Sequence, residues 1–480
     1  MEFNIIMKTL HLISSDWMYS PHFETDLELI EKSIIDGNEP ISIICNGNLN
    51  SCLISKNPNW KDCVRCIGRR KNGISLLSRK IKTIAFNIEK FIINKDLESL
   101  FNPPNTLKEL VQIKIGNFDL GYAVATLLVD QTKNPEISPK QDIEYTKLLM
   151  SIVYKTYLWF GEILDREKPE KVYAMNGRHL YYRAIYQSCL DRGIPIFMHE
   201  RGGDMNSYML FENSLPHSLL FWDKLIKEYR LTKEPEFILD NGSKYYSRKF
   251  SGEGLNWHSF VSDQQKNKLP HNIHKYPVKI GVFMSSEFEF AAVSPEWDEK
   301  PYPDQNQGIL RICNEMNDSR YHFFIRAHPN MRGHSNSHLN YLENNTPTNA
   351  SFISPESEIS SYALLKNCDV ILTFGSTMAV EACYWGKPSI NAGPAPYRSL
   401  NIGVKCNTHS EVIKALKGDW KVGSKDDAIL YGAMMATYGI PFKHVKMETP
   451  FKGTFKGKDA NKITSPWRRI ALRMASWMGL

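Results

Sequence analysis

The sequence lacks several features that would each point to a particular class of protein. No uninterrupted apolar run approaches the roughly 18 residues that a membrane-spanning helix requires, and residues 1–15 do not have the pattern of a secretory signal. No basic stripe interleaved with aromatics is present, which argues against a nucleic-acid partner. No internal repeat of a solenoid period occurs. These absences predict a cytoplasmic globular protein whose nine cysteines are reduced.

Four of the cysteines gather in one segment rich in Asn and Gly: Cys45, Cys52, Cys63 and Cys66. The last two form a Cys-x-x-Cys pair, which is typical of zinc ligands. The first two are spaced more widely than zinc ligands usually are. Structural zinc and free thiols therefore both stay open.

The chain is long enough for two or three domains, at about 150 residues per domain. Its hydrophobic fraction of 42% and charged fraction of 23% are those of a globular protein. We therefore expect extensive hydrophobic cores.

The net charge of +7 is concentrated near the end of the sequence. Residues 443–473 hold nine Lys and Arg against two acidic residues, so the remainder is formally neutral. Ser465 and Pro466 are good residues to begin a helix, and the segment after them is amphipathic and basic. Such a helix suits the anionic inner face of the cytoplasmic membrane, which would make the protein peripheral there. The alternative is that this helix packs on the body of the protein.

Strand and helix patterns alternate through the first half of the chain, with short links between them. This order indicates a parallel sheet covered by helices. We predict one such domain over residues 1–265, with strands at Thr9–Ile13, Ile41–Cys45, Lys171–Met175 and Pro195–His199 and helices from His22, at Tyr145–Leu164 and at Tyr181–Arg192.

The alternation restarts after a polar stretch at 262–276 and predicts a second domain over 277–437, followed by the basic tail 438–480. The predicted strands of this domain are Val278–Met284, His322–Ile325, Phe352–Ile353, Asp369–Phe374 and Pro388–Asn391. The fold class is α/β, with two doubly wound Rossmann-like domains facing a cleft. Ligands of such domains bind at the carboxyl ends of the strands.

One strand-turn-helix segment in the second domain has the composition of a phosphate site. An apolar strand stops at Phe374, Gly375 permits a tight turn, and Ser376 and Thr377 open a helix whose N–H groups suit an anion. Glu381 follows one turn later, where a carboxylate can accept hydrogen bonds from a ribose diol. The alternative is a turn whose small residues only allow close packing.

Two other strand ends of this domain carry polar residues that suit the same ligand. Arg326 and His328 follow the strand His322–Ile325, and guanidinium and imidazolium groups both bind phosphate oxygens. Ser286 follows the first strand and is a further candidate for a phosphate or a sugar carboxylate. We predict donor binding by Ser286, Arg326, His328, Gly375, Ser376, Thr377 and Glu381.

These motifs resemble those of a known group of enzymes. Gly375, Glu381 and the run 386–388 (Gly-Lys-Pro) are similar to the nucleotide-binding signature of GT-B glycosyltransferases. The runs 326–329 (Arg-Ala-His-Pro) and 393–397 (Gly-Pro-Ala-Pro-Tyr) resemble the capsule polysaccharide biosynthesis proteins, which include Kdo transferases. The resemblance implies a GT-B fold, a nucleotide-sugar co-substrate and a glutamate that holds the ribose; we expect the co-substrate to be linked to UDP or CMP. The Gly-Ser-Thr turn departs from the Ser-rich turn of many relatives, so base and sugar are not carried over.

The first domain is expected to supply the acceptor site and the catalytic base. Sugar transfer needs a carboxylate or His to take the proton of the acceptor hydroxyl. Glu200, Asp204 and His22 follow strand or loop ends and are the catalytic candidates, with Glu200 favoured; in a retaining reaction Glu200 or Asp204 acts as nucleophile. Asn176 and Arg178 are candidates for acceptor binding. No paired Asp-x-Asp stands at a strand end, which predicts metal-independent transfer.

The leading interpretation is a glycosyltransferase that acts on a capsule or lipopolysaccharide O-antigen glycan, with a lipid-linked or oligosaccharide acceptor. A nucleotide-sugar 2-epimerase shares the architecture, although the basic tail has no use with a small soluble substrate. A non-catalytic capsule assembly protein is the third alternative.

Overall fold

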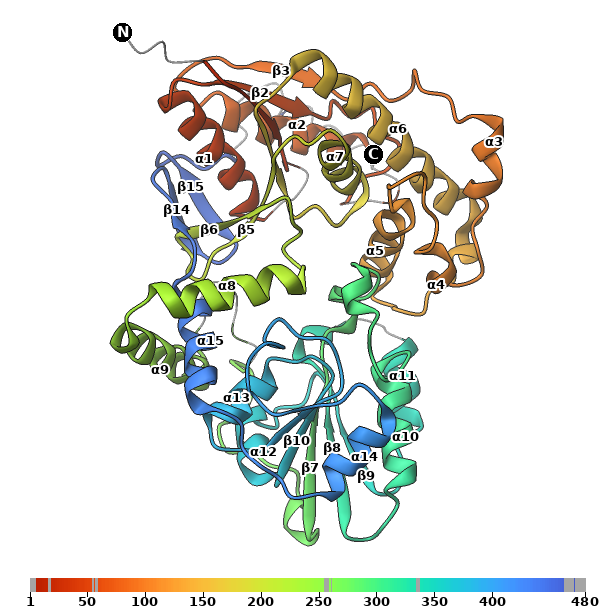
Figure 1. The fold of residues 1–480 in the computed structure, drawn as a ribbon, viewed down its shortest axis with the longest axis vertical. Coiled ribbons are helices and arrows are strands. Elements are labelled where there is room, and N and C mark those ends of the chain that lie inside the picture. Colours follow the sequence, from red (N-terminus) through yellow and green to blue (C-terminus); the bar gives the residue numbers. More distant parts are fainter. Residues whose placement is uncertain are drawn as a thin grey trace. The chain divides into compact units, whose positions relative to one another are not determined.

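The computed structural model describes residues 6–15, 19–53, 56, 59–253, 259, 261–333, 337–461 and 470. The chain forms two compact units, each built on its own sheet (Figure 1). Unit 1 comprises residues 1–128, 138–216 and 439–480, and unit 2 comprises 129–137 and 217–438.

Unit 1 is built on a seven-stranded sheet in the order β13-β6-β5-β4-β1-β2-β3. The strands from β5 to β3 run parallel, whereas β6 runs antiparallel to β5. The strands are β1 (Lys8–Leu12), β2 (Glu39–Ile44), β3 (Lys82–Ala85), β4 (Lys171–Met175), β5 (Ile196–Arg201), β6 (Ser207–Glu212) and β13 (Ile440–Pro441). The order reverses direction between β1 and β4, which is the switch point of a doubly wound domain.

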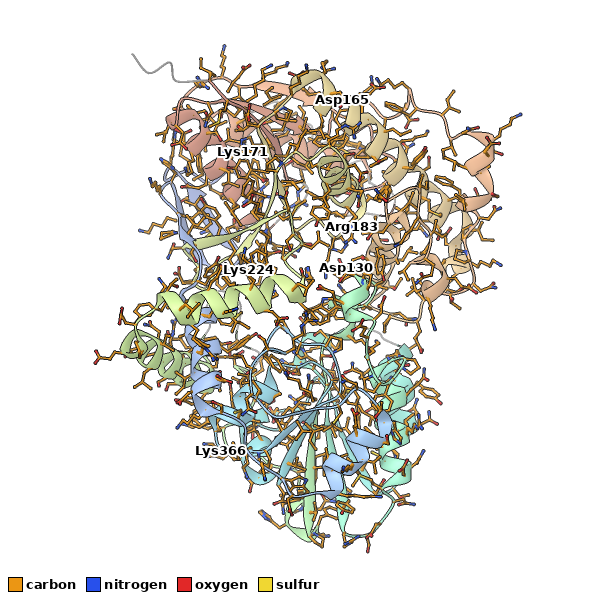
Figure 2. All side chains as sticks on the ribbon, in the orientation of Figure 1. Asp130, Asp165, Lys171, Arg183, Lys224 and Lys366 are labelled. Atoms are coloured by element: carbon orange, nitrogen blue, oxygen red, sulfur yellow. The ribbon has the colours of Figure 1, made fainter. Side chains whose placement is uncertain are left out.

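Three helices of unit 1 lie where the sequence pattern predicts them: α1 (His22–Ile35), α6 (Ile143–Glu167) and α7 (Leu180–Asp191). Four more were not predicted: α2 (Trp60–Ile74), α3 (Lys95–Glu98), α4 (Leu107–Leu110) and α5 (Leu120–Thr132), the last of which ends in unit 2. Arg183 of α7 is buried and pairs with Asp119, which immediately precedes α5 (Figure 2). This pair ties the start of α5 to α7.

Helix α1 is buried along nearly its whole length, although it carries four acidic residues. A hairpin of β14 (Val445–Thr449) and β15 (Lys452–Phe455) covers it, and Val445, Met447 and Phe455 share a hydrophobic cluster with α1 residues. Glu28 accepts hydrogen bonds from the backbone N–H groups of Lys443 and His444, both at 2.9 Å. Residues 443–455 therefore complete the first unit.

Unit 2 is built on a six-stranded parallel sheet in the order β12-β11-β10-β7-β8-β9. The strands are β7 (Val278–Phe283), β8 (Tyr321–Arg326), β9 (Ala350–Ile353), β10 (Val370–Thr373), β11 (Ser389–Asn391) and β12 (Val404–Lys405). Its helices are α8 (Leu219–Thr232), α9 (Pro235–Ser251), α10 (Gln305–Glu315), α11 (Ser337–Asn344), α12 (Ser361–Asn367), α13 (Met378–Tyr384), α14 (His409–Lys417) and α15 (Lys425–Thr437). The switch point lies between β7 and β10.

The predicted α/β class, with two doubly wound sheets, is confirmed, but the boundaries of the units differ from the predicted domains 1–265, 277–437 and 438–480. Residues 217–265 belong to unit 2 because α9 packs along α15. A Cβ atom on Gly242 of α9 would lie 2.2 Å from the carbonyl oxygen of Ile429, so this packing needs a glycine. The predicted terminal helix at 465–480 lies outside the described residues, apart from residue 470.

Among the described helices, none combines the length and hydropathy that crossing a membrane demands.

Candidate functional site

The switch point of unit 2 brings together two of the predicted loops. Residues 284–286 follow β7 and residues 374–377 follow β10, and these two strands are neighbours in the sheet. The Ser285 hydroxyl donates a hydrogen bond of 3.2 Å to the carbonyl of Phe374, which joins the loops directly. This edge is where doubly wound sheets bind their ligands.

Gly375 is fixed in a conformation that favours glycine. Its φ is +91°, and a Cβ atom there would lie 2.3 Å from the Pro394 carbonyl oxygen. Its N–H donates to Asn391 Oδ1 at 2.8 Å, and the Tyr397 hydroxyl donates to the Ser376 carbonyl at 2.7 Å. The turn is therefore held rigidly from two sides.

Two backbone donors of this turn are open. Within the part of the chain that the structure describes, the N–H groups of Ser376 and Thr377 have no acceptor. Thr377 is the N-cap of α13 and is exposed, and its side chain makes no capping hydrogen bond. Open N–H groups beside a helix start are suited to an anionic oxygen.

Ser286 and His328 form a polar pair beside this turn, at the ends of the adjacent strands β7 and β8. The Ser286 hydroxyl lies 3.0 Å from His328 Nδ1, which also accepts the Asn330 N–H at 3.1 Å. Burial, helped by Arg326 and Lys249, lowers the pKa of His328 to about 4. The imidazole is therefore neutral near pH 7, with its proton on Nε2. The expectation from the sequence that His328 is a charged imidazolium is therefore wrong.

Arg326 does not face this group of residues. Its side chain is 1% exposed, and its guanidinium donates to the carbonyl groups of Ser354 and Ser357 at 2.6 and 3.2 Å. Burial lowers its pKa to about 10, so it is still charged. In this structure Arg326 orders the loop after β9, which leaves its predicted phosphate contact without support.

Glu381 is also committed within unit 2. Its carboxylate is 3% exposed, pairs with Lys249 Nζ at 2.6 Å and accepts the Tyr362 hydroxyl. Lys249 comes from α9 and Tyr362 from α12, so the pair and the hydrogen bond join three helices. Both oxygens of Glu381 are thus engaged within the unit, which leaves its predicted ribose contact without support. The sequence did not reveal this partner, because Lys249 is distant along the chain.

Unit 1 brings three of the predicted residues together at the carboxyl ends of its strands. Asn176 follows β4 and donates from its side chain to Glu200 Oε2 at 2.8 Å. His22, the first residue of α1, places Nε2 3.6 Å from Glu200 Oε1. The Glu200 side chain is 27% exposed, so solvent or a ligand reaches it. This cluster lies beside the switch point between β1 and β4.

The protonation of the cluster follows from its burial and its hydrogen bonds. Burial opposes the charge of Glu200, but His22, the Asn176 amide and the Arg201 N–H outweigh it and lower its pKa to about 2. Burial lowers the pKa of His22 to about 3, although Glu200 opposes this change. Near pH 7 Glu200 is thus a carboxylate beside a neutral imidazole.

Of the other two predicted residues of unit 1, Arg178 borders this cluster, since its N–H lies 3.4 Å from Asn176 Oδ1, whereas Asp204 makes a separate contact. Asp204 is exposed in the turn before β6, and its carboxylate accepts the N–H of Asn206 at 2.6 Å. Arg178 directs its Nε to His179 Nε2 at 2.8 Å. The structure gives Asp204 a turn-forming contact in place of a shared site with Glu200.

One polar chain beside the cluster escaped the sequence analysis. His199 Nε2 lies 2.7 Å from Asp26 Oδ1, and Ser14 donates both its N–H and its hydroxyl to Asp26 Oδ2 at 2.7 and 2.5 Å. The rings of His22 and His199 are 6.4 Å apart between centroids. The signal in the sequence was a strand-end serine, Ser14, followed by a helix that carries Asp26 among apolar residues.

The four cysteines of the Asn-rich segment do not form a metal-binding group in the described structure. Only Glu136, Asp304 and His338 place three potential ligand atoms within 4.8 Å of one another among the described residues. Asp304 caps α10 by accepting the Gln307 N–H at 2.9 Å, and His338 Nδ1 lies 3.3 Å from Glu136 Oε2. Hydrogen bonds and ion pairs within the chain therefore explain why these three side chains lie close together.

No protein-family model matches the sequence, and no curated protein matches it significantly. Among solved structures, the chain is similar to KpsC, a beta Kdo 2,4 transferase of Thermosulfurimonas dismutans, with 14% identity over 56% of this chain and 80% of that chain and a TM-score of 0.38. It is similar to a UDP-GlcNAc 2-epimerase of Methanocaldococcus jannaschii, with 14% identity, 58% and 79% coverage and a TM-score of 0.25. A glycosyltransferase of Rickettsia africae follows, with 11% identity, 90% and 93% coverage and a TM-score of 0.27. The fold assignment itself depends on the order and direction of the strands in the two sheets.

Proposed function

We propose that the protein is a glycosyltransferase that moves a sugar from a nucleotide-sugar donor to a bacterial surface glycan. The donor diphosphate or phosphate binds at the turn after β10 in unit 2. The observation that carries this proposal is the pair of open N–H groups of Ser376 and Thr377 at the switch point of a parallel sheet.

Neighbouring groups suit the same ligand. The Ser286 hydroxyl offers a further polar contact, and neither it nor the neutral His328 ring beside it adds charge. In the transition state the leaving phosphate gains negative charge, and fixed backbone donors stabilise that charge without reorganisation. The conformation of Gly375 and the hydrogen bond from its N–H to Asn391 hold the turn in place. Stabilisation of a charged transition state requires donors that are fixed in this way.

In unit 1, Glu200 receives the acceptor hydroxyl. Its carboxylate is ionised and is oriented by Asn176 and His22, so it can accept a hydrogen bond from the nucleophile. A carboxylate with a pKa of about 2 is a weak base. We therefore expect the acceptor hydroxyl to transfer its proton to Glu200 late in the reaction, after formation of the glycosidic bond has made that hydroxyl more acidic.

The experiment removes one backbone N–H donor of the turn, that of Thr377. Thr377 has a φ of −62°, which proline adopts without strain, so Thr377→Pro deletes a single N–H. A hydrogen bond to a charged group contributes about 1.5–3 kcal/mol, so nucleotide affinity is expected to fall about 10- to 100-fold. Thr377→Ala keeps the N–H and is expected to change affinity less than threefold.

The ligands are UDP, CMP, GDP and CDP, measured by thermal shift and calorimetry on the full chain. The reaction is then followed with the labelled sugar nucleotide of the base that binds and a bacterial glycolipid extract. Label in the lipid fraction supports the transferase. An altered sugar without acceptor indicates an epimerase, and binding of none of the four nucleotides contradicts the proposal.

A further inference from the structure

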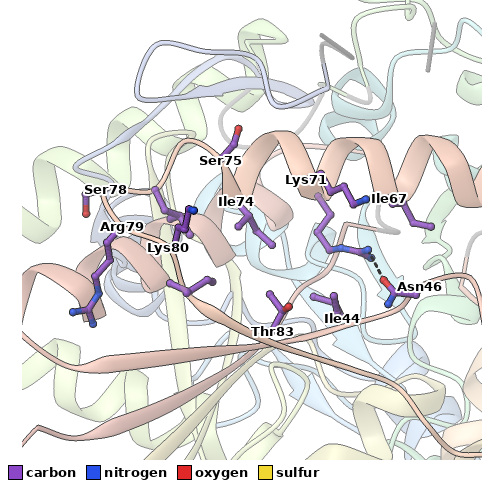
Figure 3. Close-up of a pocket in the computed structure, with 13 residues that line it drawn as sticks. Ile44, Asn46, Ile67, Lys71, Ile74, Ser75, Ser78, Arg79, Lys80 and Thr83 are labelled. Atoms are coloured by element: carbon purple, nitrogen blue, oxygen red, sulfur yellow. Dashed lines mark hydrogen bonds between the residues drawn. The ribbon is translucent and has the colours of Figure 1, made fainter. Parts of the chain in front are cut away.

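Unit 1 contains a pocket of about 940 Å³ that is separate from the Glu200 cluster. It lies between α2 and the strands β2 and β3, at the β3 edge of the sheet (Figure 3). Its volume falls within the range of small-molecule sites. Thirteen described residues line it: Ile44, Asn46, Ile67, Arg70, Lys71, Ile74, Ser75, Leu77, Ser78, Arg79, Lys80, Ile81 and Thr83.

The charged residues that line this pocket are all basic. They are Arg70, Lys71, Arg79 and Lys80, and none of the thirteen residues is acidic. Arg70 is 2% exposed, and its guanidinium donates to Asn46 Oδ1 at 2.9 Å and to the Cys45 carbonyl. A buried guanidinium at the wall and lysines at the rim make a positive environment that suits an anion.

A carboxylate does lie behind the pocket, but its charge is matched. Glu31 accepts the N–H of Ser78 at 3.0 Å and pairs with Lys456 Nζ at 2.7 Å. It is 3% exposed and is not among the lining residues. The four basic side chains of the pocket are therefore not cancelled by this neighbour.

The remaining wall is mainly aliphatic. Ile67 and Ile74 extend from α2, and Ile44 lies across from them on β2 (Figure 3). Among the described lining residues, no aromatic side chain is present to stack on a nucleobase and no carboxylate to hold the hydroxyls of a ribose or a sugar. The lining therefore selects against nucleotides and sugars and matches a molecule with a phosphate and a hydrocarbon chain.

We propose that this pocket binds a phosphate-bearing lipid, with the phosphate at the exposed lysines of its basic rim and the hydrocarbon on the isoleucines. Charge complementarity and the aliphatic wall select this occupant. The proposal depends on the pocket alone and holds whichever reaction the protein catalyses.

The experiment uses the full chain and decyl phosphate below its micellar concentration, with affinity measured by calorimetry. Inorganic phosphate and decyl maltoside are the comparison ligands. The double variant Lys71→Gln/Lys80→Gln removes two exposed charges of the pocket, and the matched control Lys224→Gln/Lys227→Gln removes two exposed charges of α8. Circular dichroism checks that both variants fold.

We expect decyl phosphate to bind the unchanged protein and the pocket variant to bind at least tenfold more weakly, with less than a twofold change in the control. Equal weakening in both variants would show a nonspecific charge effect and overturn the proposal. If inorganic phosphate binds as tightly as decyl phosphate, the pocket is a site for free phosphate. If decyl maltoside binds as tightly as decyl phosphate, the pocket is a purely apolar site. Either result, like failure of decyl phosphate to bind, refutes a phospholipid pocket.

Discussion

Lys249 Nζ lies 2.6 Å from Glu381 Oε1, on a carboxylate that is 3% exposed. The resemblance to GT-B enzymes assigns the same carboxylate to the ribose of a nucleotide. In this structure the ammonium group contacts one oxygen of that carboxylate, and the Tyr362 hydroxyl contacts the second. Both α9 and α12 are thereby held to α13.

Breaking this pair is expected to destabilise unit 2. Lys249→Met leaves a buried carboxylate without its cation, which costs about 3 kcal/mol in such pairs. The double variant Lys249→Met/Glu381→Leu is expected to recover most of that loss, because no charge is left buried. Urea unfolding midpoints measure both. Equal losses in the single and double variants would show that the pair contributes little beyond packing.

Glu200 and Asp204, the two carboxylates of one predicted loop, are expected to respond differently to neutralisation. Glu200→Gln removes the oriented carboxylate and is expected to lower the transfer rate at saturating donor at least 100-fold. Asp204→Asn changes only a turn contact and is expected to keep at least half of the rate. Rates with labelled donor compare the two, and nucleotide affinity serves as the control for folding. The reverse ranking would move the acceptor site to the turn before β6.

The rigidity of the turn after β10 depends on the space at Gly375. Alanine at Gly375 meets the Pro394 carbonyl oxygen at 2.3 Å, whereas alanine at Gly386, with φ of +74°, meets nothing within 4 Å. Gly386→Ala is therefore expected to cost about 1 kcal/mol of backbone strain and to leave nucleotide affinity unchanged. Gly375→Ala is expected to cost more and to abolish nucleotide binding. Thermal melting and calorimetry distinguish the pair, and normal binding by Gly375→Ala would be inconsistent with the proposed site.

Buried histidines make stability depend on pH. Burial, helped by His199 and Lys171, lowers the pKa of His11 to about 3, and His22 and His328 titrate near 3 and 4. In the unfolded chain the pKa of a histidine is about 6.5, so between this pH and the lower pKa of the folded protein the unfolded chain binds more protons. The free energy of unfolding is therefore largest above pH 6.5 and decreases as the pH falls towards 4. At pH 5, each of these histidines is expected to lower the free energy of unfolding by about 2 kcal/mol from its value above pH 6.5.

Urea unfolding at pH 7.5 and pH 5.0 measures this loss. His11→Phe removes one titrating ring and keeps the stacking on Tyr173, whose centroid lies 5.0 Å away. The variant is expected to lose less stability between the two pH values than the unchanged protein. Identical losses would show that His11 does not contribute to the pH dependence.

The sequence was a good guide to the strand ends and a poor guide to their partners. Asn176, Glu200 and His22 lie far apart along the chain, but each follows or faces the carboxyl end of a parallel strand, so the topology alone brought them together. The same argument placed Ser286, His328 and Gly375 at one edge of unit 2. Periodicity and turn residues carry this information locally.

Arg326 and Glu381 show what such local reasoning misses. Arg326 stands at the predicted strand end and Glu381 one turn into the predicted helix, but each side chain turns into the unit and finds partners there. Whether a charged residue faces a ligand or a buried partner depends on residues elsewhere in the chain, such as Lys249 and Tyr362. For the same reason the membership of residues 217–265 in unit 2 was not predicted, since the packing of α9 on α15 is a tertiary contact.

The hairpin of β14 and β15 has a consequence for how the protein is made. Helix α1 leaves the ribosome early, but Glu28 obtains its amide donors from residues 443 and 444. During synthesis, Glu28 and the outer apolar face of α1 must wait for these partners while more than four hundred further residues are added. All residues of unit 2 precede the hairpin, so unit 1 is completed only after unit 2 has been made.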